Sequence, residues 1–352
     1  MKRMYMVCVS VCVWIVSASL SPAQEPMKES APQAGPNAEE TLTALTQSSL
    51  FAECPPPGFQ DDRAVTAIPK FEKRGSGALP MVLVPDVSSD STVWESFMDR
   101  NGERYTMYAL VLPGFGGTEA PPLDSRDTYE SVPASLNAER AIIRFIEDQK
   151  LGKAWLMGHG YGGQIGLRVA LARPDLVSGV VSVGGMPVVP MDDPSRDPSF
   201  IERMDIIRRT ILPQALRVPE ETWRNQQFMN AQALVSDDNR ARELAEMVTK
   251  SDRGVSLHYF LESLLLDVRP HLGKLSVPTL FIAPLTPDLG PKERVARDQW
   301  KRIVGAPPRT TLAFYEDCRH FVMDDNPAQL DIDVDLFVRG KAIPGSFRTA
   351  GP

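Results

Sequence analysis

Short apolar runs rich in β-branched residues alternate along this chain with longer stretches of helical periodicity. The runs are Met81–Val84, Tyr105–Leu112, Ala154–Met157, Val177–Val183, Thr279–Ile282 and Thr311–Phe314. Runs that are short and apolar throughout are typical of strands buried on both faces of a parallel sheet, where helices connect successive strands. The pattern therefore predicts an α/β fold with a mostly parallel sheet.

Helical periodicity is clear in the stretches between these runs. Ala134–Gln149 and Pro327–Val338 each carry an apolar side that would pack on the sheet. Four further helical stretches with charged faces lie together between the runs that end near Gly184 and begin at Thr279. They are Phe200–Leu212, Pro219–Leu234, Arg240–Lys250 and Val255–Leu266.

An insertion of this kind predicts a helical cap over the carboxyl ends of the strands, where α/β sheets bind ligands. We expect a core formed by residues 61–190 and 273–342, with the cap at residues 191–272. A pocket beneath the cap would take a small or hydrophobic molecule.

The first residues have the pattern of an export signal. Lys2 and Arg3 precede the apolar run Met6–Ala18, and Ser21-Pro22-Ala23 fits the cleavage pattern of signal peptidase. We expect residues 1–23 to be removed and the protein to be periplasmic or secreted, with no stable membrane span after cleavage. A membrane anchor is the alternative, although a span needs about 20 apolar residues. Cleavage after Ala18 is also open.

A linker or arm is predicted at residues 24–60, which are rich in Pro, Ala, Glu and Ser. A short helix is the one regular element expected there, at about Glu39–Phe51. With the signal peptide removed, the remaining cysteines are Cys54 and Cys318. A disulfide between them and two free, packed thiols are both open, because disulfides persist in exported proteins.

Composition and charge narrow the classes of partner. With 43% hydrophobic and 24% charged residues among 352, the chain suits one globular domain with an insertion. Its net charge of -7 and the absence of a Lys/Arg run argue against nucleic-acid binding. Cys and His do not have the spacing of zinc ligands, so we expect no metal and no other cofactor.

The densest motif is Gly158-His159-Gly160-Tyr161-Gly162-Gly163, between a predicted strand and a predicted helix. A glycine-rich turn of this kind could by itself hold a phosphate at a helix N-terminus. It also resembles the nucleophile elbow G-x-S-x-G of the α/β-hydrolase family, of the AB hydrolase-1 type. Gly160 stands where that family has Ser, Cys or Asp, so the nucleophile position is vacant.

Three further segments resemble this family in the right order. Val82–Ser89 is similar to the oxyanion loop, with Asp86 where a glycine is usual. Leu110–Thr118 is similar to the glycine turn that follows the next strand, and Asp317–Pro327 to the catalytic-histidine loop. The resemblance covers roughly residues 78–338 and implies the α/β-hydrolase fold.

The resemblance also assigns roles to single residues. It implies that His320 is the catalytic base and that Asp86, Val87 and Tyr161 form the oxyanion site. Asp288 follows the Thr279–Ile282 run and is the candidate acid that would orient His320, although a surface turn explains it equally well.

Two other residues near these motifs have simpler interpretations. We expect His159 to pack beside the elbow. Cys318 lies two residues from His320, but nothing in the pattern directs its sulfur toward the elbow, so we do not expect it to replace the nucleophile.

Glycine cannot attack a carbonyl, and a carboxylate at Asp86 would oppose negative charge on a bound carbonyl oxygen. Three hypotheses follow. The first is a catalytically impaired relative, a pseudoenzyme, that binds a small or hydrophobic molecule or a protein. The second is a non-covalent hydrolase of ester-type substrates, in which His320, oriented by Asp288 or Asp86, activates a water in the space at Gly160. The third is an ordinary hydrolase whose serine was replaced by mutation. We favour the first.

Overall fold

The computed structural model describes residues 53–60, 62–121, 128–191 and 196–348, so the predicted signal peptide and most of the predicted arm lie outside it. At its centre is one eight-stranded sheet with the order β1-β3-β2-β4-β5-β6-β7-β8. The strands are β1 Lys70–Arg74, β2 Leu79–Val84, β3 Tyr105–Val111, β4 Ala154–His159, β5 Val177–Val183, β6 Thr279–Pro284, β7 Thr310–Tyr315 and β8 Phe347–Arg348. Strands β2 to β7 are parallel, which confirms the predicted fold class.

Every strand predicted from an apolar run is present, whereas the sequence pattern missed β1 and β8. Both pair antiparallel at the edges of the sheet. Strand β1 is the polar segment Lys-Phe-Glu-Lys-Arg, and both residues of β8 are exposed. Edge strands with solvated faces have no need of an apolar run, so hydrophobicity alone does not reveal them.

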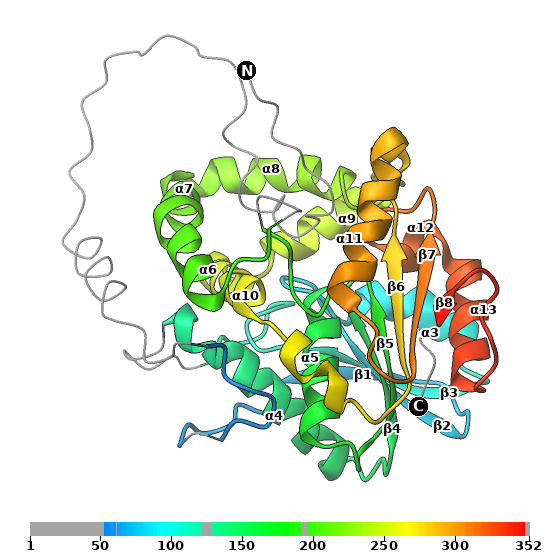
Figure 1. Ribbon diagram of the computed structural model, residues 1–352. Coiled ribbons are helices and arrows are strands. Elements are labelled where there is room, and N and C mark those ends of the chain that lie inside the picture. Colours follow the sequence, from blue (N-terminus) through cyan, green and yellow to red (C-terminus); the bar gives the residue numbers. More distant parts are fainter. Residues whose placement is uncertain (1–52, 61, 122–127, 192–195, 349–352) are drawn as a thin grey trace, which may run out of the picture.

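Helices cover both faces of the sheet (Figure 1). The elements outside the β5–β6 insertion are η2 Ser91–Trp94, α3 Glu95–Asn101, η3 Tyr129–Ser131, α4 Pro133–Asp148, α5 Tyr161–Ala172, η6 Pro287–Lys292, α11 Glu293–Val304, α12 Val322–Asp325 and α13 Pro327–Val338. Met81 and Leu83 of β2 pack in the cluster with α3 and α13, whereas Val82 and Val84 pack with α4, α5 and α11. Alternate residues of a strand point to opposite faces, so a strand covered on both sides is apolar throughout.

The chain between β5 and β6 is helical. Its elements are α6 Phe200–Ile206, the π-helical turn η4 Ile207–Ile211, α7 Leu212–Arg217, α8 Glu220–Gln232, α9 Asp238–Thr249, α10 Arg253–Leu265 and η5 Arg269–Lys274. The first predicted helix, Phe200–Leu212, instead widens at η4 and continues to Arg217. Pro213 explains the wide turn, because a proline lacks the N–H that an α-helix needs at that position.

The end of the predicted arm packs onto the core around a buried ion pair. Arg168 Nε of α5 lies 2.7 Å from Glu139 Oε2 of α4, and both side chains are almost fully buried. Arg168 also donates to the Pro55 carbonyl, and the Gly58 N–H donates to Glu139. Residues 55–58 are therefore fixed to the domain by charge-assisted hydrogen bonds.

Both cysteines in the described residues are free thiols. Cys54 packs against the cluster that contains α4 and α5, whereas Cys318 belongs to the cluster on the α13 face. Of the two open possibilities, the structure therefore has the free, packed thiols.

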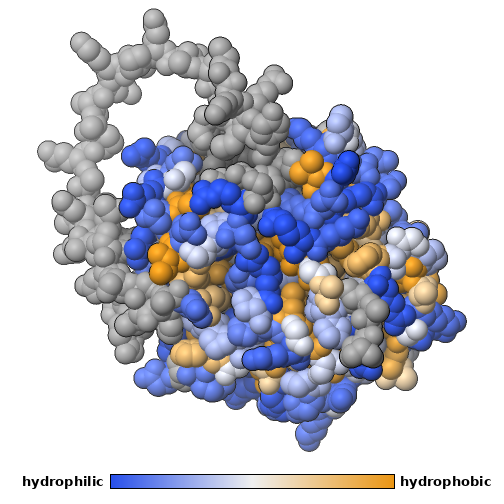
Figure 2. All heavy atoms as spheres, viewed as in Figure 1, coloured by the Kyte–Doolittle hydropathy of each residue, from blue (hydrophilic) through white to orange (hydrophobic). Residues whose placement is uncertain are grey.

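The face shown in Figure 2 is mainly hydrophilic, with small hydrophobic patches between the charged residues. Within the described part of the chain, no helix has both the length and the apolarity to cross a membrane.

Candidate functional site

The predicted site residues converge at one edge of the sheet. Asp86 follows β2, Gly160 follows β4, and His320 follows β7. Because parallel strands end at the same edge, loops that are far apart in the sequence meet there.

The turn between β4 and α5 has the geometry of an elbow. Gly160 has φ 51° and ψ −116° between the strand and the helix. A Cβ at Gly158 would lie 2.2 Å from the backbone of Gly162, and a Cβ at Gly162 would lie 2.4 Å from the carbonyl oxygen of Val84. The glycines are thus required for the strand, the helix and the neighbouring loop to approach this closely.

The carboxylate of Asp86 lies where the side chain of a nucleophile would stand. A Cβ built on Gly160 would be 2.2 Å from Asp86 Oδ2 and 2.3 Å from its Cγ. Only glycine at position 160 is compatible with this placement of Asp86. The two departures from the family pattern, glycine at position 160 and aspartate at position 86, are therefore complementary. The sequence motifs did not reveal this relation.

Both oxygens of Asp86 are held by hydrogen bonds. Oδ1 accepts the N–H groups of Tyr161 and Val87, each at 2.8 Å. Oδ2 lies 2.7 Å from Nε2 of His320. An ionised carboxylate only accepts hydrogen bonds, so Nε2 carries a hydrogen. The two N–H groups predicted to form the oxyanion site therefore bind an anion supplied by the protein itself.

The local loop supports this arrangement. Ser88 has φ 60°, and the Ser89 N–H donates to the carbonyl oxygen of Asp86 at 3.1 Å. This tight turn brings the Val87 N–H back toward the carboxylate of Asp86. A non-glycine residue in the left-handed region is uncommon and is a form of backbone strain often found at functional sites.

Burial alone would raise the pKa of Asp86, but its interactions reverse this effect. The hydrogen bond from His320 and its charge, with the Tyr161 N–H, bring the pKa below its ordinary value. Asp86 is therefore ionised at neutral pH although only 5% of it is exposed.

His320 is 2% exposed and presents Nε2 to Asp86. In a catalytic triad Nε2 faces the nucleophile, and the acid binds Nδ1. Asp86 thus stands in the nucleophile's place rather than in that of an orienting acid. Among the described residues, Nδ1 of His320 has no hydrogen-bond partner. Asp288 lies in η6, after β6, but its side chain is outside the described part, so its role stays a prediction.

His159 packs beside the elbow. Its Nε2 lies 3.1 Å from the His320 carbonyl oxygen, and the centres of the two imidazole rings are 4.2 Å apart. Burial, followed by the charge of His320, lowers the pKa of His159 to about 3. His159 is therefore a neutral packing residue at physiological pH.

A pH dependence of stability follows from His159. Its pKa is about 3 in the folded protein and about 6.5 in an unfolded chain. Between these values only the unfolded chain binds the proton, so stability falls as the pH decreases, by up to about 1.4 kcal/mol per pH unit. His159→Gln keeps a donor for the His320 carbonyl but cannot bind a proton. In this variant the unfolding free energy measured in urea should therefore change less with pH between about pH 4 and pH 6. Equal slopes in both proteins would contradict the assignment.

The spacing of Cys and His in the sequence argued against a metal site, yet the fold assembles a group that the spacing could not show. Potential ligand atoms of Asp86, His159 and His320 lie within 4.8 Å of one another. The hydrogen bonds described above already involve both Asp86 oxygens and Nε2 of each histidine. A metal bound there through Asp86 would have to replace some of these bonds.

Cys318 does not serve as a substitute nucleophile in this arrangement. Its side chain is fully buried, and its Sγ lies 3.6 Å from the Arg319 carbonyl oxygen. Burial, with a contribution from the charge of Asp325, raises the pKa of Cys318 to about 12. A thiol that stays protonated is a weak nucleophile.

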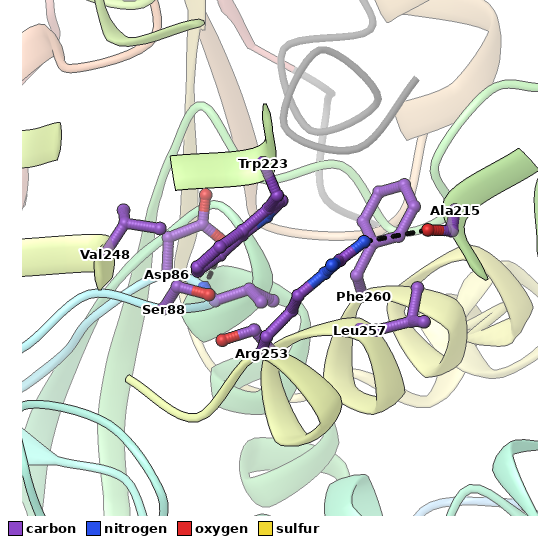
Figure 3. Close-up of a pocket in the computed structure, with 10 residues that line it drawn as sticks. Asp86, Ser88, Ala215, Trp223, Val248, Arg253, Leu257 and Phe260 are labelled. Carbon is purple, nitrogen blue, oxygen red and sulfur yellow. Dashed lines mark hydrogen bonds between the residues drawn. The ribbon is translucent and has the colours of Figure 1, made fainter. Parts of the chain in front are cut away.

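A small cavity of about 30 Å³ reaches Asp86 from beneath the inserted helices. Its walls are Asp86, Val87, Ser88, Ala215, Trp223, Val248, Arg253, Ser256, Leu257 and Phe260. Figure 3 shows Asp86 and Ser88 on one side of Trp223, with Arg253 hydrogen bonded to the Ala215 carbonyl on the other. The cavity is thus mainly apolar, with one carboxylate and one guanidinium among its lining groups.

Known proteins share both the sequence pattern and the fold. A methyl ester esterase of pimeloyl-[acyl-carrier protein] from Nitrosomonas europaea is 26% identical over 262 residues, which are 71% of this chain and 91% of that protein. An abhydrolase domain-containing protein of Caenorhabditis elegans is 26% identical over 134 residues, 38% of this chain and 28% of that protein.

Solved structures agree with this fold. An esterase from Rhodococcus sp. ECU1013 superposes with a TM-score of 0.57 at 18% identity, over 77% of this chain and 94% of its own. An esterase from Exiguobacterium antarcticum has a TM-score of 0.59 at 17% identity, over 76% and 94%. The family comparison matches residues 81–331 to the alpha/beta hydrolase family. The chain therefore belongs to the α/β hydrolase family.

Proposed function

We propose that this protein is an exported α/β hydrolase that has lost serine-type acyl transfer and keeps a capped pocket for a small molecule. The observation that carries the proposal is the position of Asp86. Its carboxylate fills both the nucleophile's place and the oxyanion site. Export is inferred from the N-terminal sequence, and the cap is the helical insertion over the cavity.

Two separate requirements of acyl transfer are blocked in this arrangement. Gly160 has no attacking atom, and the N–H groups of Tyr161 and Val87 are already bound to Asp86 Oδ1. Removing one oxyanion donor costs a serine hydrolase about 10² to 10³ in turnover. An anion fixed at both donors also repels the charge that develops on a substrate oxygen.

Water-based hydrolysis is the second candidate, favoured by the buried contact between His320 and Asp86. In its simplest form a water beside Gly160 would be activated by His320. The carboxylate of Asp86 occupies that space and is already hydrogen bonded to Nε2 of His320. The attacking water would therefore have to approach from the cavity, on the far side of Asp86.

Hydrolysis of aryl esters and thioesters tests the proposal. We expect the natural protein to be inactive and Gly160→Ser alone to stay inactive, because Asp86 still fills the oxyanion site. Gly160→Ser with Asp86→Gly should exceed the single variant by about 10²- to 10³-fold, the value of a restored donor. His320→Ala in the double variant is the control and should abolish the gain. Ester hydrolysis by the natural protein that is lost with His320→Ala would favour the water-based mechanism instead.

A further inference from the structure

We propose that Asp86 is itself a nucleophile, delivered from the loop after β2, and that it reacts with small compounds that carry a leaving group on a saturated carbon. The inference goes beyond the proposed binding function and uses the same cavity. It rests on three positions that Asp86 takes at once: over Gly160, opposite the imidazole Nε2, and between the two N–H groups.

The hydrogen bonds made by the described residues leave one lone-pair site of the Asp86 carboxylate unused. A carboxylate has about four lone-pair sites. Oδ1 accepts from Tyr161 and Val87, and Oδ2 has only His320 as a hydrogen-bond partner among the described residues. One lone pair of Oδ2 is thus unused, and Asp86 is one of the residues that line the cavity. A fixed, partly desolvated carboxylate in the wall of a cavity is suited to nucleophilic attack.

The filled oxyanion site selects the kind of carbon that can react. Attack on a carbonyl carbon would need hydrogen-bond donors for the substrate oxygen, and the N–H groups of Tyr161 and Val87 already donate to Oδ1. Displacement at a saturated carbon places no new charge on a substrate oxygen, so it needs no such donors. In that step Oδ2 forms a bond to carbon, the bond to the leaving group breaks, and the leaving group departs as an anion with the electron pair. The product is an alkyl ester of Asp86.

Breakdown of this ester uses the same residues. Once Oδ2 is esterified, it no longer carries the charge that holds a hydrogen on Nε2, and His320 can change to its other tautomer through solvent. Nε2 then takes a proton from water, and the hydroxide adds to the carboxyl carbon of Asp86. The charge develops on Oδ1, where the N–H groups of Tyr161 and Val87 lie. Collapse expels the alkoxide, which takes the proton from His320. Asp86 is left as a carboxylic acid, and loss of its proton restores the carboxylate. The net reaction converts R–X and water into R–OH, X⁻ and a proton.

The cavity limits the size of the substrate. Its volume of about 30 Å³ has room for roughly two or three water-sized groups. Its walls include Trp223 and Phe260. A primary alkyl compound with two or three heavy atoms meets these limits, and bromoethane is a suitable probe.

Bromide release and peptide mass spectrometry with bromoethane test the proposal. The natural protein should release bromide and form ethanol, and Asp86→Asn should release bromide only at the background rate. His320→Gln keeps an N–H for Asp86 but cannot take the proton, so ester breakdown should slow by about 10²- to 10⁴-fold. An ethyl group should then accumulate on the peptide that contains Asp86. Asp298→Asn, a change at an exposed carboxylate on α11, is the control and should behave like the natural protein.

A thermal shift with bromoethane separates this proposal from the binding function. A rise in Tm without bromide release or an ethyl group on Asp86 would overturn the nucleophile and leave the pocket intact. Absence of the shift, the bromide and the ethyl group with the natural protein would overturn the nucleophile, whereas the loss of serine-type acyl transfer is tested separately by the Gly160→Ser and Asp86→Gly variants. Bromide release that is unchanged in Asp86→Asn would also refute the role of Asp86.

Discussion

Serine at position 160 should destabilise the folded protein, and it should do so less when the Asp86 carboxylate is absent than when it is present. The added Cβ would lie 2.2 Å from Asp86 Oδ2. Overpacking of a buried site costs about 1–3 kcal/mol, and a side chain in the sparsely populated backbone conformation of Gly160 costs roughly another 1–3 kcal/mol. In Gly160→Ser with Asp86→Gly the first cost disappears. A double-mutant cycle by urea unfolding should therefore give a coupling energy of about 0.5–3 kcal/mol in favour of the pair.

Two other glycines serve as matched controls for this cycle. Gly117 also has a positive φ, 74°, but a Cβ there would meet nothing within 4 Å, so Gly117→Ser measures the backbone cost alone. Gly273 has open space and no positive φ, so Gly273→Ser should change stability by less than about 0.5 kcal/mol. If Gly160→Ser costs no more than Gly117→Ser, Asp86 does not occupy the space at Gly160.

Removing the Asp86 side chain should cost about as much as breaking a buried ion pair, about 3–5 kcal/mol of unfolding free energy for Asp86→Ala. The N–H groups of Tyr161 and Val87 and the imidazole of His320 would lose their acceptor inside the protein. Asp86→Asn keeps an oxygen for the two N–H groups, and its amide can donate to Nε2 in the other tautomer of His320. It should therefore cost clearly less than Asp86→Ala.

Asp298→Ala is the reference for Asp86→Ala, because Asp298 is an exposed carboxylate, 62% accessible, opposite Arg294. Its loss should change stability by no more than about 0.5 kcal/mol. Equal effects at Asp86 and Asp298 would show that Asp86 is solvated rather than held at the elbow.

Much of the fold was predictable, because the central strands are buried on both faces and must therefore be apolar. The edge strands β1 and β8 could not be predicted in this way, because many of their side chains face solvent and are polar. The break at η4 depends on one proline inside an otherwise regular helical pattern. Its local effect on the turn cannot be read from periodicity.

The site was predictable only in part. The elbow turn and the loop of His320 follow from local motifs, and the structure places both beside Asp86. The complementary relation between Gly160 and Asp86 depends on two loops that meet only in the folded protein. Glycine at position 160 and aspartate at position 86 each indicated loss of acyl transfer. The structure adds that the Asp86 carboxylate fills the space of the side chain missing at Gly160.

A crystal structure of the protein at neutral pH would show whether the Asp86 carboxylate replaces the missing side chain at Gly160. We expect density for the Asp86 carboxylate over Gly160, with Oδ1 in hydrogen-bond contact with the N–H groups of Tyr161 and Val87 and Oδ2 in contact with His320 Nε2. An Asp86 side chain turned away from the elbow, with a water bound by the two N–H groups, would contradict this placement.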